Sequence, residues 1–304
     1  MDWIKRHGKI LAITLIGIFV FLILAFVGIA YLAAGVMTYR TSNRIDASPT
    51  LIADKYENIE FKSPEGLKLK GTYFPKNGSD RLIIYVTGIK PNRFDEYYLI
   101  PMIAQDSLAH NYSVLIFDSR AHGISEGARL DYGSTSGRDL VGAVDWAKAK
   151  GFDPKKIGIL GNSTGAVSMV MVSGELKNVG ALILDSSTDN FTNVLTSQIE
   201  REGNLPSFFA PLVFYFSNLR FGIDLEHIIP LDHVKDDPNR AYLFLQGDKD
   251  GTTSYESAMN LYKHANQNSK FVTFKDVGHV ESYRMDHKLW EDSVFPWLDS
   301  QLAK

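Results

Sequence analysis

The chain has 304 residues, of which 45% are hydrophobic and 22% are charged, and its formal net charge at pH 7 is −3. These values are those of an ordinary globular protein. The net charge gives no reason to expect a nucleic-acid partner, and the sequence shows no extended Lys/Arg patch. The absence of cysteine excludes disulfides, a cysteine nucleophile and thiolate metal sites.

The N-terminal segment carries no charged residue between Ile10 and Tyr39. A helix needs about 20 apolar residues to cross the hydrocarbon core of a bilayer, so residues 10–37 are predicted to form a transmembrane anchor. The basic residues within residues 1–9 favour a short cytoplasmic segment there, with the rest of the chain outside the cell membrane.

A cleavable signal peptide is the alternative interpretation of the same segment, and it would give a secreted protein. The apolar part of a signal peptide is usually about 7–15 residues long, which is much shorter than this run. Ala33-Ala34-Gly35 nevertheless offers small residues for cleavage, and Arg40 and Arg44 weaken the predicted orientation. An uncleaved single-pass anchor is the interpretation we favour.

Residues 38–55 are predicted to be a polar linker, and residues 56–304 a single α/β domain. Short Val/Ile/Leu runs alternate there with amphipathic helical patterns, which predicts a mainly parallel eight-stranded sheet with helices on both faces. The predicted strands are 58–62, 67–74, 82–86, 113–117, 157–160, 181–184, 242–245 and 271–274, of which the first two form a hairpin. The predicted helices are 95–109, 139–150, 166–172, 254–266 and 283–302.

The long interval between Asp185 and Arg240 breaks this alternation and is rich in aromatic residues. A structureless loop of this length is improbable inside a compact domain. We therefore predict a helical cap at about residues 187–238, lying over the edge of the sheet. Most of its aromatic residues are expected to pack on the main domain, and a few are candidates for lining a pocket.

The stretch Gly161-Asn162-Ser163-Thr164-Gly165 lies between a predicted strand and a predicted helix. Gly-x-Ser-x-Gly in this context is typical of a nucleophile elbow, where the serine sits on so tight a turn that its neighbours must be small. The N-terminus of the following helix offers free N–H groups to developing negative charge. An ordinary helix N-cap is the alternative role for this serine.

A serine hydroxyl becomes an effective nucleophile when a base removes its proton, and a third group orients that base. Where a nucleophile elbow is used, the acid and then the histidine follow the serine along the chain. Asp250 follows the predicted strand 242–245, and His279 follows the last predicted strand, so these two residues satisfy the order. The alternatives are Asp248 or Asp185 as the acid and His287, inside the last predicted helix, as the histidine.

Four motifs occur in one order: Asp118-Ser119-Arg120-Ala121-His122-Gly123-Ile124-Ser125, the elbow, Gly247-Asp248-Lys249-Asp250 and Gly278-His279. With them, residues 58–302 resemble the α/β-hydrolase superfamily, in its exported or membrane-anchored esterase-like branch related to serine aminopeptidases and prolyl oligopeptidase. The resemblance implies Ser163 as nucleophile, His279 as base and Asp250 as orienting acid. It also implies a structural role for Asp118, Arg120 and His122, with Ala121 standing where the family usually has glycine.

The resemblance also implies an oxyanion hole made of two backbone N–H groups. One belongs to Thr164, and the other should come from the loop after strand 82–86. The family usually has His-Gly-x in that loop, whereas this chain has Thr87-Gly88-Ile89, so Ile89 is the candidate donor. Lys90 and Arg93 follow in the same loop and are either exposed residues or candidate ligands for an anionic group of the substrate.

Together these features predict a membrane-anchored, extracytoplasmic serine hydrolase, most simply a carboxylesterase that acts on a small ester or related acyl compound through an acyl-enzyme. The proposed chemistry requires neither a metal nor an organic cofactor, and the sequence shows no obligatory protein partner. A peptidase or an acyltransferase with the same three residues is the alternative. A membrane-tethered binding module without catalytic activity is a further alternative.

Overall fold

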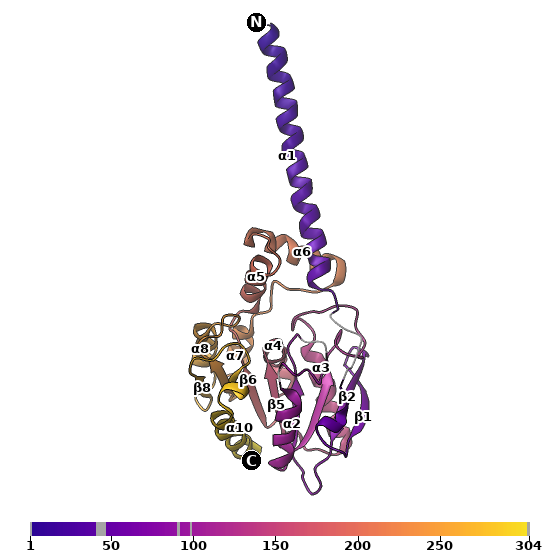
Figure 1. Ribbon diagram of the computed structural model, residues 1–304, viewed down its shortest axis with the longest axis vertical. Coiled ribbons are helices and arrows are strands. Elements are labelled where there is room, and N and C mark those ends of the chain that lie inside the picture. Colours follow the sequence, from indigo (N-terminus) through magenta and orange to yellow (C-terminus); the bar gives the residue numbers. More distant parts are fainter. Residues whose placement is uncertain (1, 41–46, 90–91, 98, 303–304) are drawn as a thin grey trace.

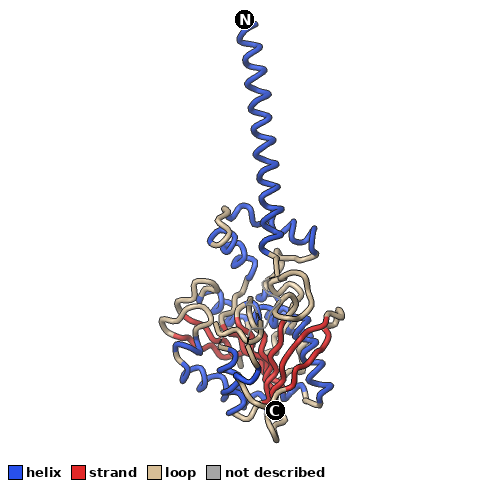
Figure 2. The backbone as a smooth tube through the Cα atoms, turned by 45° about the vertical axis from the view of Figure 1, so that its right-hand side comes forward, coloured by secondary structure: helices blue, strands red, loops and turns tan. Residues whose placement is uncertain are grey.

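A single mixed sheet forms the centre of the protein in the computed structural model, which describes residues 2–40, 47–89, 92–97 and 99–302 (Figure 2). The strands are β1 (Glu57–Lys62), β2 (Lys68–Phe74), β3 (Leu82–Val86), β4 (Ser113–Asp118), β5 (Ile157–Asn162), β6 (Ala181–Asp185), β7 (Leu243–Gly247) and β8 (Lys270–Phe274). Their order in the sheet is β1-β2-β4-β3-β5-β6-β7-β8. The pairs β1–β2 and β2–β4 are antiparallel and the others are parallel, so the predicted sheet is confirmed.

Helices cover both faces of this sheet. On one face lie α2 (Ile100–Ala109) and α10 (His287–Leu302), and on the other lie α3 (Gly137–Lys150), α4 (Thr164–Met171), α7 (Pro230–Asp236) and α8 (Tyr255–His264). Strand β3 illustrates the division, because Ile83 and Tyr85 join the core beneath α2 and α10, whereas Ile84 joins the core on the other face. Burial on both faces explains why the strands are continuous apolar runs.

Two predicted helices differ clearly from the observed ones, whereas the other three agree to within two residues at each end. The helix predicted at 95–109 begins only at Ile100, with Pro101 in its first turn. A proline deeper in the helix would remove a backbone hydrogen bond and clash with the preceding turn, so the helix begins where the ring is tolerated. The helix predicted at 283–302 is divided at Asp286 into α9 (Ser282–Met285) and α10.

The predicted cap contains α5 (Phe191–Arg201) and α6 (Ala210–Phe221), and α6 packs against the end of the long helix α1 (Asp2–Met37) (Figure 1). Helix α7 lies within the predicted cap range, but its Val234 is part of the sheet core beside α4 and α8. The part of the insertion that stands away from the sheet therefore ends before Pro230.

Helix α1 is bonded to the domain at its C-terminal end. The last four carbonyls of an α-helix lack partners within the helix. Here those of Ala34 and Val36 accept from the backbone just beyond the helix, the Gly35 carbonyl accepts from Arg129 Nη1 (3.0 Å), and the Met37 carbonyl accepts from Tyr132 Oη (2.7 Å). The helix is thus capped by side chains of the α/β domain. Residues 41–46 of the predicted linker, including Arg44, lie outside the described residues.

Candidate active site

Ser163 lies on a sharp turn between β5 and α4, with φ 52° and ψ −121°. A positive φ is costly for a residue with a side chain, and it persists only where the surroundings enforce it. A Cβ added to Gly161 would lie 2.7 Å from Ala166 N, and one added to Gly165 would lie 2.2 Å from Val86 O. Both flanking glycines are therefore required by close backbone approach, as the elbow interpretation predicted.

The three residues that the sequence singled out are connected by hydrogen bonds. His279 Nε2 lies 2.9 Å from Ser163 Oγ, and His279 Nδ1 lies 2.8 Å from Asp250 Oδ2. The Ser163 side chain makes no N-cap hydrogen bond to α4, which argues against its alternative role as a helix cap. With Nδ1–H donating to the carboxylate, the second ring nitrogen is free to accept the serine proton.

Asp250 is buried and held by several donors besides the imidazole. Its Oδ1 accepts from the backbone N–H groups of Thr252 and Thr253, and its Oδ2 accepts from Thr253 Oγ1 and Gln246 Nε2. Burial by itself raises the pKa of this carboxyl, but the hydrogen bond and charge of His279, together with these backbone donors, hold the pKa below its ordinary value. The acid therefore stays ionised beside the imidazole.

The two alternative acids lie elsewhere. Asp248 accepts a hydrogen bond from the backbone N–H of Asp276, which stabilises the turn between β8 and the histidine loop. Asp185 is buried at the end of β6, accepts from Ser282 Oγ (2.7 Å), and has a pKa that burial raises to about 6. Its backbone carbonyl accepts a hydrogen bond from the N–H of Ser163, so Asp185 stabilises the backbone of the elbow.

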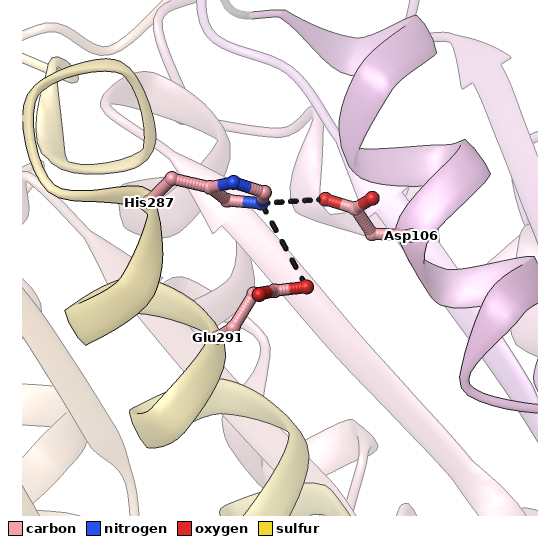
Figure 3. A group of neighbouring side chains, drawn as sticks. All are labelled: Asp106, His287 and Glu291. Atoms are coloured by element: carbon pink, nitrogen blue, oxygen red, sulfur yellow. Dashed lines mark hydrogen bonds and ion pairs between the residues drawn. The ribbon is translucent and has the colours of Figure 1, made fainter.

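The alternative histidine, His287, is bonded to a different part of the fold. Figure 3 shows its ring between Asp106 of α2 and Glu291 of α10, with Nε2 2.9 Å from Asp106 Oδ2 and 3.8 Å from Glu291 Oε1. Asp106 also accepts from Tyr283 Oη (2.5 Å). These contacts join the start of α10 to α2. The geometric closeness of three such groups would suit a metal ion, but the histidine and the acids already satisfy one another.

The two proposed oxyanion donors belong to neighbouring segments. Thr164 is the first residue of α4, where backbone N–H groups lack acceptors within the helix. The close approach of Gly165 to Val86 O places this first turn beside the loop that carries Ile89. The loop after β3 therefore lies beside the elbow, and the roles of the Thr164 and Ile89 N–H groups stay predictions.

Lys90, one of the two candidate substrate ligands, lies outside the described residues. For the other, Arg93, the structure contradicts the predicted role in binding an anionic group of the substrate. The Arg93 side chain is 4% exposed, and its Nη1 lies 2.5 Å from Asp118 Oδ2. Its Nε donates to Thr72 Oγ1 (3.1 Å), and its backbone N–H donates to Asp118 Oδ1. A buried guanidinium that is neutralised by a buried carboxylate has little capacity left for an anionic substrate.

The motif around Asp118 has the structural role that the resemblance implied. Arg120 forms hydrogen bonds with both carboxylate oxygens of Asp139 on α3, and Asp118 forms an ion pair with Arg93. Ala121 has φ 61°, in the region that favours glycine, which accounts for the glycine that the family usually has there.

Sequence reasoning missed the residues that support the acid, and it missed an apolar cavity that Ile89 helps to line. Thr252 and Thr253 donate at the second and third positions after Asp250, a spacing typical of an Asx turn, so the sequence held a signal for them. The cavity has a volume of about 590 Å³ and lies between α1, the cap and Ile89. It carried no local signal, because its walls come from distant parts of the chain.

Comparisons with known proteins match both halves of the domain. Residues 119–304 match the model of the prolyl oligopeptidase family, and residues 39–198 match that of the X-Pro dipeptidyl-peptidase (S15) family. The uncharacterized protein YqkD of Bacillus subtilis is 27% identical over 252 residues, which are 81% of each chain.

Solved structures are similar over most of the chain. The esterase Pf2001 of Pyrococcus furiosus has a TM-score of 0.73 and 25% identity, covering 88% of this chain and 98% of its own. The α/β-hydrolase GrgF of a Penicillium species has a TM-score of 0.65 and 19% identity, covering 82% of this chain and 100% of its own.

Proposed function

Because the chain belongs to the prolyl oligopeptidase family of the α/β-hydrolase superfamily, and is a serine hydrolase, we propose that it is a membrane-anchored carboxylesterase acting through an acyl-enzyme on Ser163. The observation that carries this proposal is the hydrogen-bonded row of Asp250, His279 and Ser163. His279 Nδ1 lies 2.8 Å from Asp250 Oδ2, and His279 Nε2 lies 2.9 Å from Ser163 Oγ. Similarity to the Pyrococcus furiosus esterase supports an ester as the substrate.

The geometry supports a two-step reaction. Ser163 Oγ attacks the ester carbonyl while His279 Nε2 takes its proton, and the N–H groups of Thr164 and Ile89 stabilise the oxyanion of the tetrahedral intermediate. The imidazolium then gives its proton to the departing alkoxide, leaving the acyl group on the serine. A water molecule, deprotonated by the same imidazole, attacks the acyl-enzyme, and the imidazolium returns that proton to Ser163 Oγ as the acid is released. Asp250 stabilises the imidazolium in both steps.

A peptidase is the second candidate, because both matching family models are named for peptidases. The same three residues hydrolyse amides and esters, and the choice between them depends on how the site binds the leaving group. Rates of hydrolysis of p-nitrophenyl esters, measured beside those of aminoacyl and prolyl p-nitroanilides, separate the two functions. We expect turnover of the esters and little release of p-nitroaniline.

A fluorophosphonate probe is expected to label the full-length protein in detergent micelles, because the probe phosphonylates serines whose hydroxyl is activated. Ser163→Ala should abolish both labelling and ester turnover. Ser300→Ala is the matched control, since that hydroxyl lies in α10, where it donates to the Trp297 carbonyl and accepts from Gln301 Nε2, and it should change neither. Labelling that persists in Ser163→Ala would overturn the assignment of the nucleophile.

We also propose that α1 anchors the protein with its α/β domain outside the cytoplasm. One helix in the described part of the chain, His7–Met37, is long and apolar enough to cross a membrane by length and composition. The basic residues that precede it support an N-terminus in the cytoplasm.

Because the chain lacks cysteine, a single introduced thiol tests this topology. Asn178 is exposed on the α/β domain. In intact cells, a membrane-impermeant maleimide is expected to label the Asn178→Cys variant as fully as it does after lysis. Labelling that requires lysis would place the domain in the cytoplasm, and recovery of the labelled domain in the culture medium would indicate cleavage instead.

A further inference from the structure

The apolar cavity of about 590 Å³ lies between the membrane helix, the cap and Ile89, the candidate oxyanion residue. One wall consists of successive turns of α1, including Ile29, Ala33 and Val36. The facing wall is formed by the cap, with Ile199 and Leu205 among its residues. A helix predicted to lie in lipid thus forms part of a cavity in the α/β domain.

The inner end of this cavity reaches the oxyanion loop. Ile89 is one of the residues that line the cavity, and its backbone N–H is the candidate second oxyanion donor. A hydrocarbon chain lying in the cavity would therefore bring its carbonyl end toward the place where Ser163 attacks. The lining is mainly apolar, with Gln198 and Glu202 as its polar members besides tyrosines.

The length of α1 places the outer end of the cavity at the membrane surface. Residues 10–37 of a helix are about 42 Å long, whereas the hydrocarbon core is about 30 Å thick. A span that begins at Ile10 ends near Ile29, which is the first cavity-lining residue of α1. The following two turns, which carry the other lining residues, then lie at the level of the lipid headgroups.

The cap presents apolar side chains at this same level. Phe208, Tyr215 and Leu219 are 65%, 56% and 65% exposed. The ring of Phe208 lies 5.8 Å from that of Phe26, which precedes Ile29 by one turn of α1. Exposed aromatic and apolar side chains beside the end of a membrane helix are typical of residues that enter the interfacial layer.

The wall that α1 contributes is held firmly in place. Ala30 and Ala34 are fully buried against the cap, and such small residues one turn apart allow close approach of helices. Arg220 of α6 donates to the Tyr31 carbonyl and stacks 3.7 Å over the Tyr31 ring. These contacts fix α1 against the cap, so both walls of the cavity are held in place.

We propose that this cavity binds the hydrocarbon chain of a membrane-held ester, so that the substrate reaches Ser163 from the bilayer along α1. The substrate class is a lipid-like ester with a long acyl chain, which leaves the facing leaflet without passing through water. Transfer of a chain from lipid to an apolar cavity changes its hydration little, so access and fit determine the choice of substrate. This proposal rests on the proposed ester hydrolase function.

The first test compares Ala33→Phe, which fills the cavity wall, with Ala12→Phe, which makes the same change on the lipid-exposed part of α1. For monomeric substrates in water, each methylene that enters an apolar site can raise kcat/KM up to about fourfold. Wild-type protein should therefore hydrolyse p-nitrophenyl octanoate at least about tenfold better than the acetate. Ala33→Phe should remove most of that preference while keeping acetate turnover, and Ala12→Phe should change neither rate.

Equal loss of both rates in Ala33→Phe, or a wild-type preference for acetate, would overturn the proposal while leaving the esterase function intact. Absence of acetate and octanoate turnover would instead overturn the proposed function. A binding measurement then tests, without relying on turnover, whether the cavity binds a hydrocarbon chain.

For that measurement, full-length Ser163→Ala protein in phosphatidylcholine vesicles is irradiated with a fatty acid that carries a diazirine in its tail. Cross-links are expected at the cap wall, around Ile199 and Leu205, and should disappear when Ala33→Phe is added. Cross-links confined to the lipid-exposed residues 10–24 of α1, or unaffected by Ala33→Phe, would show that the chain does not occupy the cavity.

Discussion

Replacing His279 by alanine is expected to lower kcat for a short-chain ester by about 10⁵- to 10⁶-fold, because its imidazole is the base hydrogen-bonded to Ser163 Oγ among the described residues. Replacing Asp250 by asparagine should cost about 10⁴-fold, since an amide neither stabilises the imidazolium nor fixes the ring tautomer as a carboxylate does. Both changes should act on kcat more than on KM. Steady-state hydrolysis of p-nitrophenyl acetate by the full-length protein measures these losses.

Two neighbouring residues provide matched controls. His287→Ala removes an imidazole that is bonded to Asp106 and Glu291, and Asp248→Asn alters a carboxylate that accepts only from the Asp276 backbone among the described residues. Each should leave kcat within about threefold of wild type, as expected for groups outside a connected catalytic row. A loss in Asp248→Asn equal to that in Asp250→Asn would move the role of the acid to the alternative residue.

The sheet and the hydrogen-bonded arrangement of the three candidate catalytic residues could be predicted because their signals are local. Each buried strand is a short Val/Ile/Leu run, such as Leu82–Val86, and its burial on both faces makes that run continuous. The row follows from chain order: Ser163, Asp250 and His279 each follow a parallel strand, and such strand ends meet at one edge of the sheet. Neither inference required knowledge of contacts between distant segments.

The attachment of α1 to the cap was not predicted, because a helix that is apolar all round shows no face for packing. Its Ala30 and Ala34 become recognisable as a contact surface only once α6 is known to lie against them. The cavity was missed for the same reason. The helix predicted from residue 95 began too early, because its apolar spacing outweighed the restriction set by Pro101.

The burial of Arg93 could not be predicted from its surroundings in sequence either. A charged residue in a loop beside a candidate site is usually exposed. Its partner, Asp118, lies 25 positions further along the chain at the end of β4, and the two meet only because β3 and β4 are neighbours in the sheet. The contact explains why the motif that begins at Asp118 has a structural role.

Replacing Arg93 by methionine is therefore expected to destabilise the protein by about 3–5 kcal/mol, because the change leaves the Asp118 carboxylate buried without its counter-charge. The double variant Arg93→Met with Asp118→Asn should recover much of this loss, since the amide oxygen can still accept the backbone N–H of residue 93. Denaturant unfolding of the full-length protein in detergent micelles measures both. Arg138→Met is the matched control, since its ion pair with Glu65 is partly exposed, and it should cost at most about 1 kcal/mol.

The same variants separate a structural role from a substrate-binding role. If Arg93 supports the fold alone, the folded Arg93→Met protein should keep its KM for both neutral and anionic esters, because the guanidinium is already engaged by Asp118 and Thr72. Unchanged stability with a raised KM for anionic esters alone would restore the role that its position beside Ile89 suggested. The buried ion pair makes the first outcome the expected one, because a charge that is paired and excluded from water attracts a distant anion only weakly.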